Sequence, residues 1–263
     1  MIQERMAIFG GVYSNHIALA ALLADVRQRG IGQLYCLGDL GAFGPHPDRV
    51  FPLLRAAQVA MVQGNYDHSL GHGLPDCRCG YTDARDNYFA RLSYAYTFQN
   101  TSAANKRWLK DLPPERRLTF AGRPVLLCHG SPRQTNEFLW ESTTSNAFLA
   151  RMFRDADADV IVATHTGLPW HRELPGDRHF INCGALGRPA NDGRTAVWYA
   201  VLSAVAGGGL DVEFVPLEYD YRQLAAEMRA EQLPEEFVTT IETGWWTTCL
   251  EILPARERAR GKY

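Results

Sequence analysis

The feature that most constrains the fold is a repeated order of apolar run, glycine turn and helical pattern early in the chain. Apolar runs at residues 6–9, 34–37 and 60–62 are each followed closely by glycine, and residues 17–26 and 51–57 carry apolar side chains at helical spacing. Such alternation predicts a parallel sheet with helices packed on it. In sheets of this kind functional side chains gather on loops at the carboxyl ends of the strands.

A second group of predicted strands lies in the later part of the chain. The segment before it, residues 68–114, is less regular and is interpreted as a helical insertion or cap, with a helix at 101–112 ended by two prolines. The further strands are expected at residues 117–120, 125–128, 160–163, 180–182, 196–202 and 212–215. Two strand groups around a helical segment predict an α/β fold of two stacked mixed β-sheets flanked by helices.

We interpret residues 1–263 as a single domain, because no change in composition asks for a second one. Residues 216–263 are expected to form a C-terminal helix and tail, with Trp245 and Trp246 covering one edge of the sheets. The formal net charge of −2 gives no electrostatic attraction for nucleic acid or anionic membrane. We therefore expect a soluble, cytoplasmic protein without a nucleic-acid or membrane partner, for which a homo-oligomer is possible.

Four predicted strand ends carry side chains of the types that commonly bind metal ions. They are Asp39, Asn65, His129 and His165, and each lies in a turn that contains glycine. One carboxylate, one amide oxygen and two imidazoles suit a divalent transition metal such as Mn, Fe, Zn or Co. Neighbouring strands can bring these distant positions together, so the four residues predict a mononuclear metal site.

The order of these turns resembles that of the calcineurin-like metallophosphoesterases. The chain has Gly-Asp-Leu-Gly at 38–41, Gly-Asn-Tyr-Asp at 64–67, His-Gly-Ser-Pro at 129–132 and Thr-His-Thr-Gly at 164–167. The run Asn-Cys-Gly-Ala-Leu-Gly-Arg-Pro at 182–189 is similar to the run that closes the sheet in the bacterial branch of that family. The resemblance implies the αββα sandwich of the family and a metal-dependent phosphoesterase activity.

The departures from the family pattern concern the first of its two metal positions. Where the family has Asp-x-His after the first strand, this chain has Gly11 and Tyr13, and Gly167 replaces the second histidine of Gly-His-x-His. The resemblance therefore implies that only the second position keeps its full set of ligands, which are Asp39, Asn65, His129 and His165. We expect one divalent ion per chain.

The histidine that assists the leaving group in the family is also absent, because Tyr66 stands in its place. We name Tyr66, Tyr13 and Asp67 as candidate catalytic residues. A phenol, with a pKa near 10, donates a hydrogen bond but transfers protons poorly at neutral pH. In the alternative interpretation both tyrosines fill the space of a missing metal ion. Candidate phosphate-binding residues are Asn15, Arg133 and Arg188.

A second possible metal or thiol site follows the third strand. His68 and His72 share a helix face, and Cys77 and Cys79 follow them, so the four side chains could form a tetrahedral zinc site. The chain contains six cysteines and shows no export signal, so we expect reduced thiols rather than a disulfide framework. Two further interpretations stay open: free thiols without a metal, or soft ligands or redox thiols placed over the pocket.

These observations favour a metal-dependent phosphatase or phosphodiesterase that acts on a small phosphorylated or nucleotide-like molecule. The intact second metal site favours catalysis, because one ion can still polarise a phosphoryl group and acidify a water molecule. The missing Asp-x-His favours two alternatives: a non-catalytic module that binds a phosphate ligand or regulates a partner, and different chemistry in a rebuilt pocket.

Overall fold

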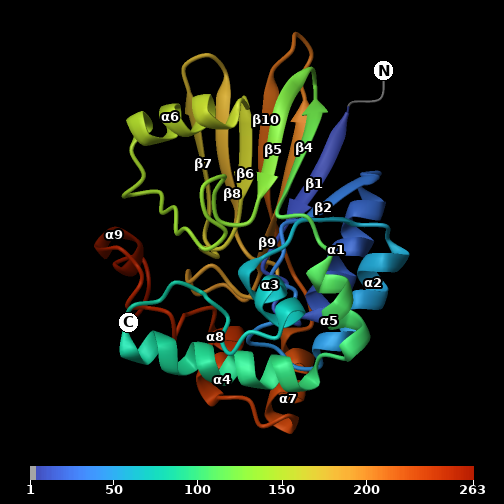
Figure 1. Cartoon of the computed structure of the whole chain (residues 1–263), viewed down its shortest axis with the longest axis vertical. Helices are drawn as coiled ribbons and strands as arrows, with labels where there is room; N and C mark the ends of the chain where they lie inside the picture. Colours follow the sequence, from blue (N-terminus) through green and yellow to red (C-terminus); the bar gives the residue numbers. More distant parts are fainter. Residues whose placement is uncertain (1–3) are drawn as a thin grey trace.

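The structure, a computed structural model, describes residues 4–263 and contains two five-stranded sheets (Figure 1). The first sheet has the order β10-β9-β1-β2-β3. Strands β1, β2 and β3 run parallel, and β9 pairs antiparallel with both β1 and β10. The strand bounds are β1 (Arg5–Phe9), β2 (Gln33–Cys36), β3 (Ala60–Met61), β9 (Val197–Ala204) and β10 (Leu210–Leu217).

The second sheet has the order β4-β5-β6-β8-β7 and is also mixed. Strands β5, β6 and β8 run parallel, while β4 and β7 are antiparallel strands at the two edges. The bounds are β4 (Glu115–Phe120), β5 (Arg123–Cys128), β6 (Val160–Ala163), β7 (Pro169–Leu174) and β8 (Arg178–Cys183). The predicted α/β fold of two mixed sheets is confirmed.

The side chains of the buried strands alternate between two hydrophobic clusters, as the two-residue period of a strand requires. In β1, Met6 and Ile8 pack with Val125 and Leu127 of the other sheet, so this cluster is the core between the sheets. Ala7 and Phe9, by contrast, join the cluster that contains the side chains of α1 and α2. A third cluster joins α6 to the outer face of the second sheet. The layers are therefore helix, sheet, sheet and helix.

The helices divide between the sheet faces and the end of the molecule where the parallel strands terminate. Figure 1 shows α1 and α2 beside the first sheet, α6 beside the second, and α4 and α7 at the end opposite the N-terminus. The helices are α1 (His16–Gln28), η1 (Pro47–Arg49), α2 (Val50–Ala56), α3 (Asn65–His72), α4 (Ala84–Asn100), α5 (Ala103–Lys110), α6 (Asn146–Ala156), α7 (Tyr221–Ala230), α8 (Glu235–Thr243) and α9 (Ala255–Arg258). None of the helices in residues 4–263 combines the length and hydrophobicity needed to cross a bilayer.

Some elements were not predicted from the sequence. Helix α4 lies in the segment interpreted as a helical insertion, but it was not predicted as a separate helix, because its aromatic side chains are spread around the helix rather than forming one apolar stripe. Strand β7 begins at a proline and contains three consecutive charged or titratable residues, which hides its strand character. Helices α6, α8 and α9 were also missed.

We expect Phe180→Ala to lower the free energy of unfolding by about 3–5 kcal/mol, because the substitution leaves a cavity in a packed core. Phe180 is fully buried between the second sheet and α6. Urea unfolding of the variant measures the change. Tyr88→Ala is the matched control, since Tyr88 is 51% exposed, and it should change stability by about 0.5 kcal/mol or less. Equal losses in the two variants would contradict the position given to Phe180.

Candidate metal centre

Three of the predicted ligands lie together at the carboxyl ends of their strands. Ligand atoms of Asp39, His129 and His165 are all within 4.8 Å of one another, and all three side chains are buried. Nε2 of His129 lies 3.3 Å from Oδ2 of Asp39 and 3.1 Å from Nδ1 of His165. Ligands held about 2.0–2.1 Å from one tetrahedral ion are about 3.3–3.4 Å apart. The spacing of the three side chains therefore suits a shared cation.

The amide of Asn65 supplies a fourth oxygen at the start of α3. Its Nδ2 donates to the carbonyl oxygen of Cys77 at 2.9 Å, which fixes the orientation of the amide. Its Oδ1 is buried and has no hydrogen-bond partner among the described residues. A buried acceptor without a partner is costly, and a bound cation would satisfy it. The set of one carboxylate, one amide oxygen and two imidazoles thus fits a divalent transition metal.

Strained backbone and a close approach of two loops place these ligands. Asp39 and His165 both have left-handed backbone, with φ of 56° and 65°, which is uncommon for residues other than glycine and concentrates at functional sites. The turns after β2 and β3 touch each other: a Cβ atom on Gly38 would lie 2.2 Å from the backbone nitrogen of Gly64. Glycine at position 38 therefore lets the loops of Asp39 and Asn65 meet.

Asp67 joins the same two loops through its carboxylate. Its Oδ2 accepts hydrogen bonds from the backbone N–H groups of Asp39 and Gly64, both at 2.8 Å, and its Oδ1 accepts one from Leu40 at 3.0 Å. Burial, and then the negative charge of Asp39, raises the pKa of Asp67 to about 6. We named Asp67 as a candidate catalytic residue, but its contacts are those of a residue that positions Asp39.

The charges of the other ligands are set by burial and by one another. Burial alone would raise the pKa of Asp39, but the imidazole of His129 holds it below its ordinary value. Burial, followed by the neighbouring His129, lowers the pKa of His165 to about 3. His165 is therefore neutral near pH 7, which is the form that binds metal ions.

We expect Asp67→Ala to lower the free energy of unfolding by about 3 kcal/mol or more, because three buried N–H groups would lose their acceptor. Asp67→Asn keeps an acceptor oxygen for at most two of them and should cost less. Urea unfolding of both variants measures the difference. A loss below about 1 kcal/mol for Asp67→Ala would show that the two loops do not depend on this carboxylate.

Aromatic side chains lie against the two glycines that replace ligands of the first metal position in the family pattern. The ring of Tyr13 folds over Gly11, since a Cβ atom on Gly11 would lie 2.8 Å from Cζ of Tyr13. On the other side, a Cβ atom on Gly167 would lie 3.3 Å from the indole of Trp246. The two places where family ligand side chains are missing thus face a phenol and an indole. For Tyr13, this agrees with the space-filling interpretation of the sequence.

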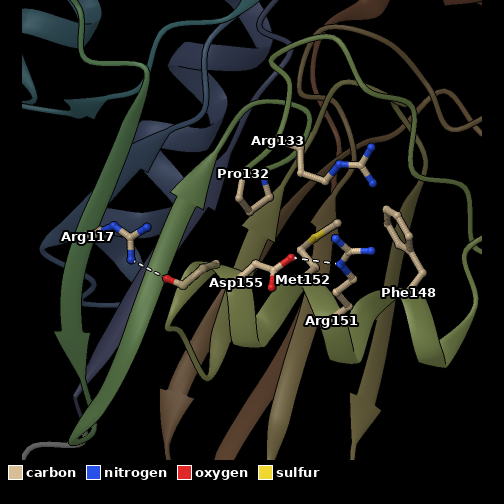
Figure 2. A pocket seen from close by; sticks show the side chains of 8 residues that line it. Arg117, Pro132, Arg133, Phe148, Arg151, Met152 and Asp155 are labelled. Atoms are coloured by element: carbon tan, nitrogen blue, oxygen red, sulfur yellow. Dashed lines mark hydrogen bonds and ion pairs between the residues drawn. The ribbon is translucent and has the colours of Figure 1, made fainter.

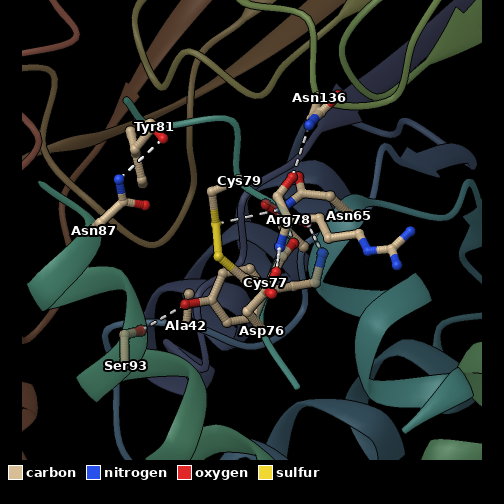
Figure 3. Close-up of a disulfide and its surroundings, with 12 residues drawn as sticks. Ala42, Asn65, Asp76, Cys77, Arg78, Cys79, Tyr81, Asn87, Ser93 and Asn136 are labelled. Carbon is tan, nitrogen blue, oxygen red and sulfur yellow. Dashed lines mark hydrogen bonds between the residues drawn. A yellow bond between two sulfur atoms is a disulfide. The ribbon is translucent and has the colours of Figure 1, made fainter. Parts of the chain in front are cut away.

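The loop with Cys77 and Cys79 corrects two expectations. The two cysteines form a disulfide, with Cα atoms 5.3 Å apart (Figure 3). They are therefore not reduced, and sulfur atoms bonded to each other cannot act as thiolate ligands for a zinc ion with His68 and His72. In the described chain, the two histidines contact each other, with ring centroids 4.2 Å apart. The other four cysteines, Cys36, Cys128, Cys183 and Cys249, are free as expected.

We expect a thiol-reactive label to modify four cysteines of the unfolded protein without reductant and all six after reduction. Mass spectrometry counts the labels. The Cys79→Ser variant should label fully without reduction, because the partner of Cys77 is gone. Six labels on unreduced wild-type protein would show that the pair is a dithiol.

The remaining predicted residues lie in different places. The hydroxyl of Tyr66 donates to Oγ of Ser93 in α4 at 2.9 Å, so its proton is held away from the ligands. The side chain of Asn15 caps α1 by accepting from Ala18, a structural role. Arg133 lines a surface groove of about 470 Å³ with Phe148 and other residues (Figure 2).

Arg188 is the predicted phosphate-binding residue that lies beside the centre. It is 5% exposed and lines a cavity of about 20 Å³ together with Tyr13, Gly167 and His165. A second cavity of about 20 Å³ is lined by Asp39, Tyr66, Cys79 and again Tyr13 and His165. The walls are mostly aromatic, and they include side chains that the sequence did not single out, namely Phe43, Tyr81, Phe138 and Trp140.

Trp246 lines the cavity beside His165, a position that the sequence did not predict. We expected it to cover a sheet edge, whereas its Nε1 donates to the carbonyl of Pro189 at 2.6 Å and its ring lies against Gly167. It follows Gly167 by a long stretch of chain that includes four strands and two helices. Neither spacing nor composition connects the two positions, so no sequence signal could have found this contact.

Two stacked sheets with a buried Asp–His–His group at their strand ends define an α/β sandwich with a candidate metal centre. The chain belongs to the calcineurin-like phosphoesterase superfamily, whose domain model it matches over residues 5–206. The family resemblance seen in the sequence is thereby confirmed.

Known relatives are similar over nearly their whole length. The chain is 24% identical over 252 residues to an uncharacterized protein of Methanocaldococcus jannaschii, covering 89% of this chain and 96% of the relative. The crystal structure of a metallophosphoesterase from Sphaerobacter thermophilus has 27% identity and a TM-score of 0.70, covering 92% of this chain and 99% of that one. A hypothetical protein from Pyrococcus horikoshii, with 18% identity, the same coverage and a TM-score of 0.76, shows the same fold.

Proposed function

We propose that this protein is a metal-dependent phosphoesterase that acts on a small phosphorylated molecule and uses one divalent ion per chain. The ion would be held by Asp39, Asn65, His129 and His165. The observation that carries this proposal is the convergence of three buried ligand atoms within 4.8 Å in a chain of a phosphoesterase superfamily. The buried Oδ1 of Asn65, without a partner in the described chain, supports the fourth ligand.

The ion, when bound, supplies polarisation of a phosphoryl oxygen and a lower pKa for water. The protein supplies position and an enclosed, largely apolar surrounding, in which electrostatic interactions are stronger than in water. Burial, and then Asp39, raises the pKa of Tyr13 above its ordinary value. Its phenol therefore stays protonated near pH 7 and can donate a hydrogen bond to a phosphoryl oxygen, but it does not act as a base.

The aromatic rings beside Gly11 and Gly167 support a single ion. Tyr13 and Trp246 occupy the space beside Gly11 and Gly167, and neither a phenol with a raised pKa nor an indole N–H is a metal ligand. A second ion near Asp39 would also lack the family's carboxylate and histidines on that side. We therefore propose that catalysis proceeds with less metal charge than in a two-metal site.

The second candidate function is a phosphate-binding module without turnover. The enclosure of the centre favours this second function. Each of the two adjoining cavities has a volume of about 20 Å³, which is room for about one water molecule. A substrate must therefore displace part of the wall, and the loop with Cys77 and Cys79 lies over the Asn65 side of the centre. Hydrolysis of a phosphate ester distinguishes the two functions, because only the phosphoesterase turns over its ligand.

We expect purified protein to bind about one divalent transition metal ion per chain. Asn65→Ala and His165→Ala should each weaken binding at least about 100-fold, since loss of a ligand costs more than loss of a supporting hydrogen bond. Elemental analysis and competition with a chelator measure content and affinity. The matched control is His72→Ala, which removes an imidazole outside the proposed centre and should leave metal binding unchanged.

Hydrolysis of phosphomonoesters and phosphodiesters by the metal-loaded protein tests the activity. Removal of the ion by a chelator should abolish turnover, and the metal should restore it. Undiminished hydrolysis by the His165→Ala variant would contradict the proposed mechanism. One bound ion without turnover on any ester would favour the binding module, and two ions per chain would contradict the proposed single ion.

A further inference from the structure

Arg188 is a buried cation without an ion-pair partner. Its Nη2 donates to the carbonyl oxygen of Thr248 at 2.7 Å and lies 3.3 Å from the hydroxyl of the same residue. No carboxylate forms an ion pair with it anywhere in residues 4–263, and Asp86 feels its charge only at longer range. Buried charges are normally paired, because their desolvation is costly. The remaining donor nitrogens of this guanidinium, Nε and Nη1, are therefore available to bind an anion.

Two aromatic rings hold the guanidinium in place. Its Cζ lies 4.0 Å from the ring centroid of Trp246 and 4.9 Å from that of Phe43. Contacts with the faces of aromatic rings stabilise the charge without using its N–H groups. Because Nη2 donates to Thr248, Nε and Nη1 are the nitrogens that can donate to the oxygens of a phosphate.

The backbone places Arg188 next to the lost metal position. The turn that precedes it runs along the first strand end, with the N–H groups of Leu186 and Gly187 donating to Gly10 and Gly11 at 2.9 and 2.8 Å. Arg188 then lines the same small cavity as Tyr13 and His165. The positive charge thus adjoins the side of the centre where Gly11, Tyr13 and Gly167 replace metal ligands.

We propose that Arg188 is an oxyanion-binding residue that takes the place of the first metal ion. This inference rests on the proposed function and adds the class of substrate. A phosphomonoester has three non-bridging oxygens to share between the ion and the guanidinium, whereas a diester has two. The ligand recognised by this arrangement is therefore the terminal phosphate of a small monoester.

Inorganic phosphate is the probe that tests this site, with binding measured calorimetrically in metal-loaded and in metal-free protein. Arg188→Gln removes the charge but can still donate to the Thr248 carbonyl, and it should weaken phosphate binding at least about tenfold. Arg188→Lys keeps the charge but not the planar guanidinium, so its phosphate affinity should lie between those of the wild type and Arg188→Gln. The control is Arg133→Met, which removes an exposed arginine from the separate groove and should bind phosphate as the wild type does.

The outcomes separate this inference from the proposed function. Unchanged metal content with weaker phosphate binding in Arg188→Gln, together with an unchanged control, supports it. Wild-type phosphate affinity in Arg188→Gln overturns it, and so does an absence of phosphate binding in both forms of the wild-type protein. Loss of metal binding in the wild type would defeat the proposed function alone, because the metal-free measurement still decides the role of Arg188. Urea unfolding checks that each variant is folded.

Discussion

The hydrogen bonds of one buried carboxylate hold the candidate centre together. Asp67 accepts from the backbone of the loop after β2 and from Gly64 after β3, so it locks the two turns that carry Asp39 and Asn65. Because its three donors are backbone groups, the carboxylate fixes chain geometry rather than a single side chain. The strained backbone of Asp39 is tolerated for this reason, since the surrounding contacts determine it.

The sequence predicted the succession of strands and helices in the first part of the chain and the candidate ligands, because both depend on local patterns. Apolar runs ending in glycine located β1, β2 and β3, and polar residues after strands marked Asp39 and His129. What could not be predicted depends on contacts between distant segments. The disulfide in the loop over Asn65 and the position of Trp246 against Gly167 are of this kind. Neither leaves a periodic trace in the sequence.

The rebuilt side of the centre shows how a fold can keep its shape while its charge changes. The ring of Tyr13 and the indole of Trp246 take up space beside the positions where the carboxylate and a histidine are missing. The charge that a cation would have brought is met in part by the guanidinium between Phe43 and Trp246. Volume and charge are thus supplied by different residues, and a carboxylate restored at Gly11 alone would clash with the ring of Tyr13.

The position of Trp246 has a consequence for the way the pocket is enclosed. This residue lies beyond residue 206, where the match to the family domain ends, yet its ring forms part of the wall beside His165. All ten strands of the described chain precede this segment, so the two sheets alone do not complete this wall of the pocket. The enclosure of the candidate ligands therefore depends on a segment outside the matched domain.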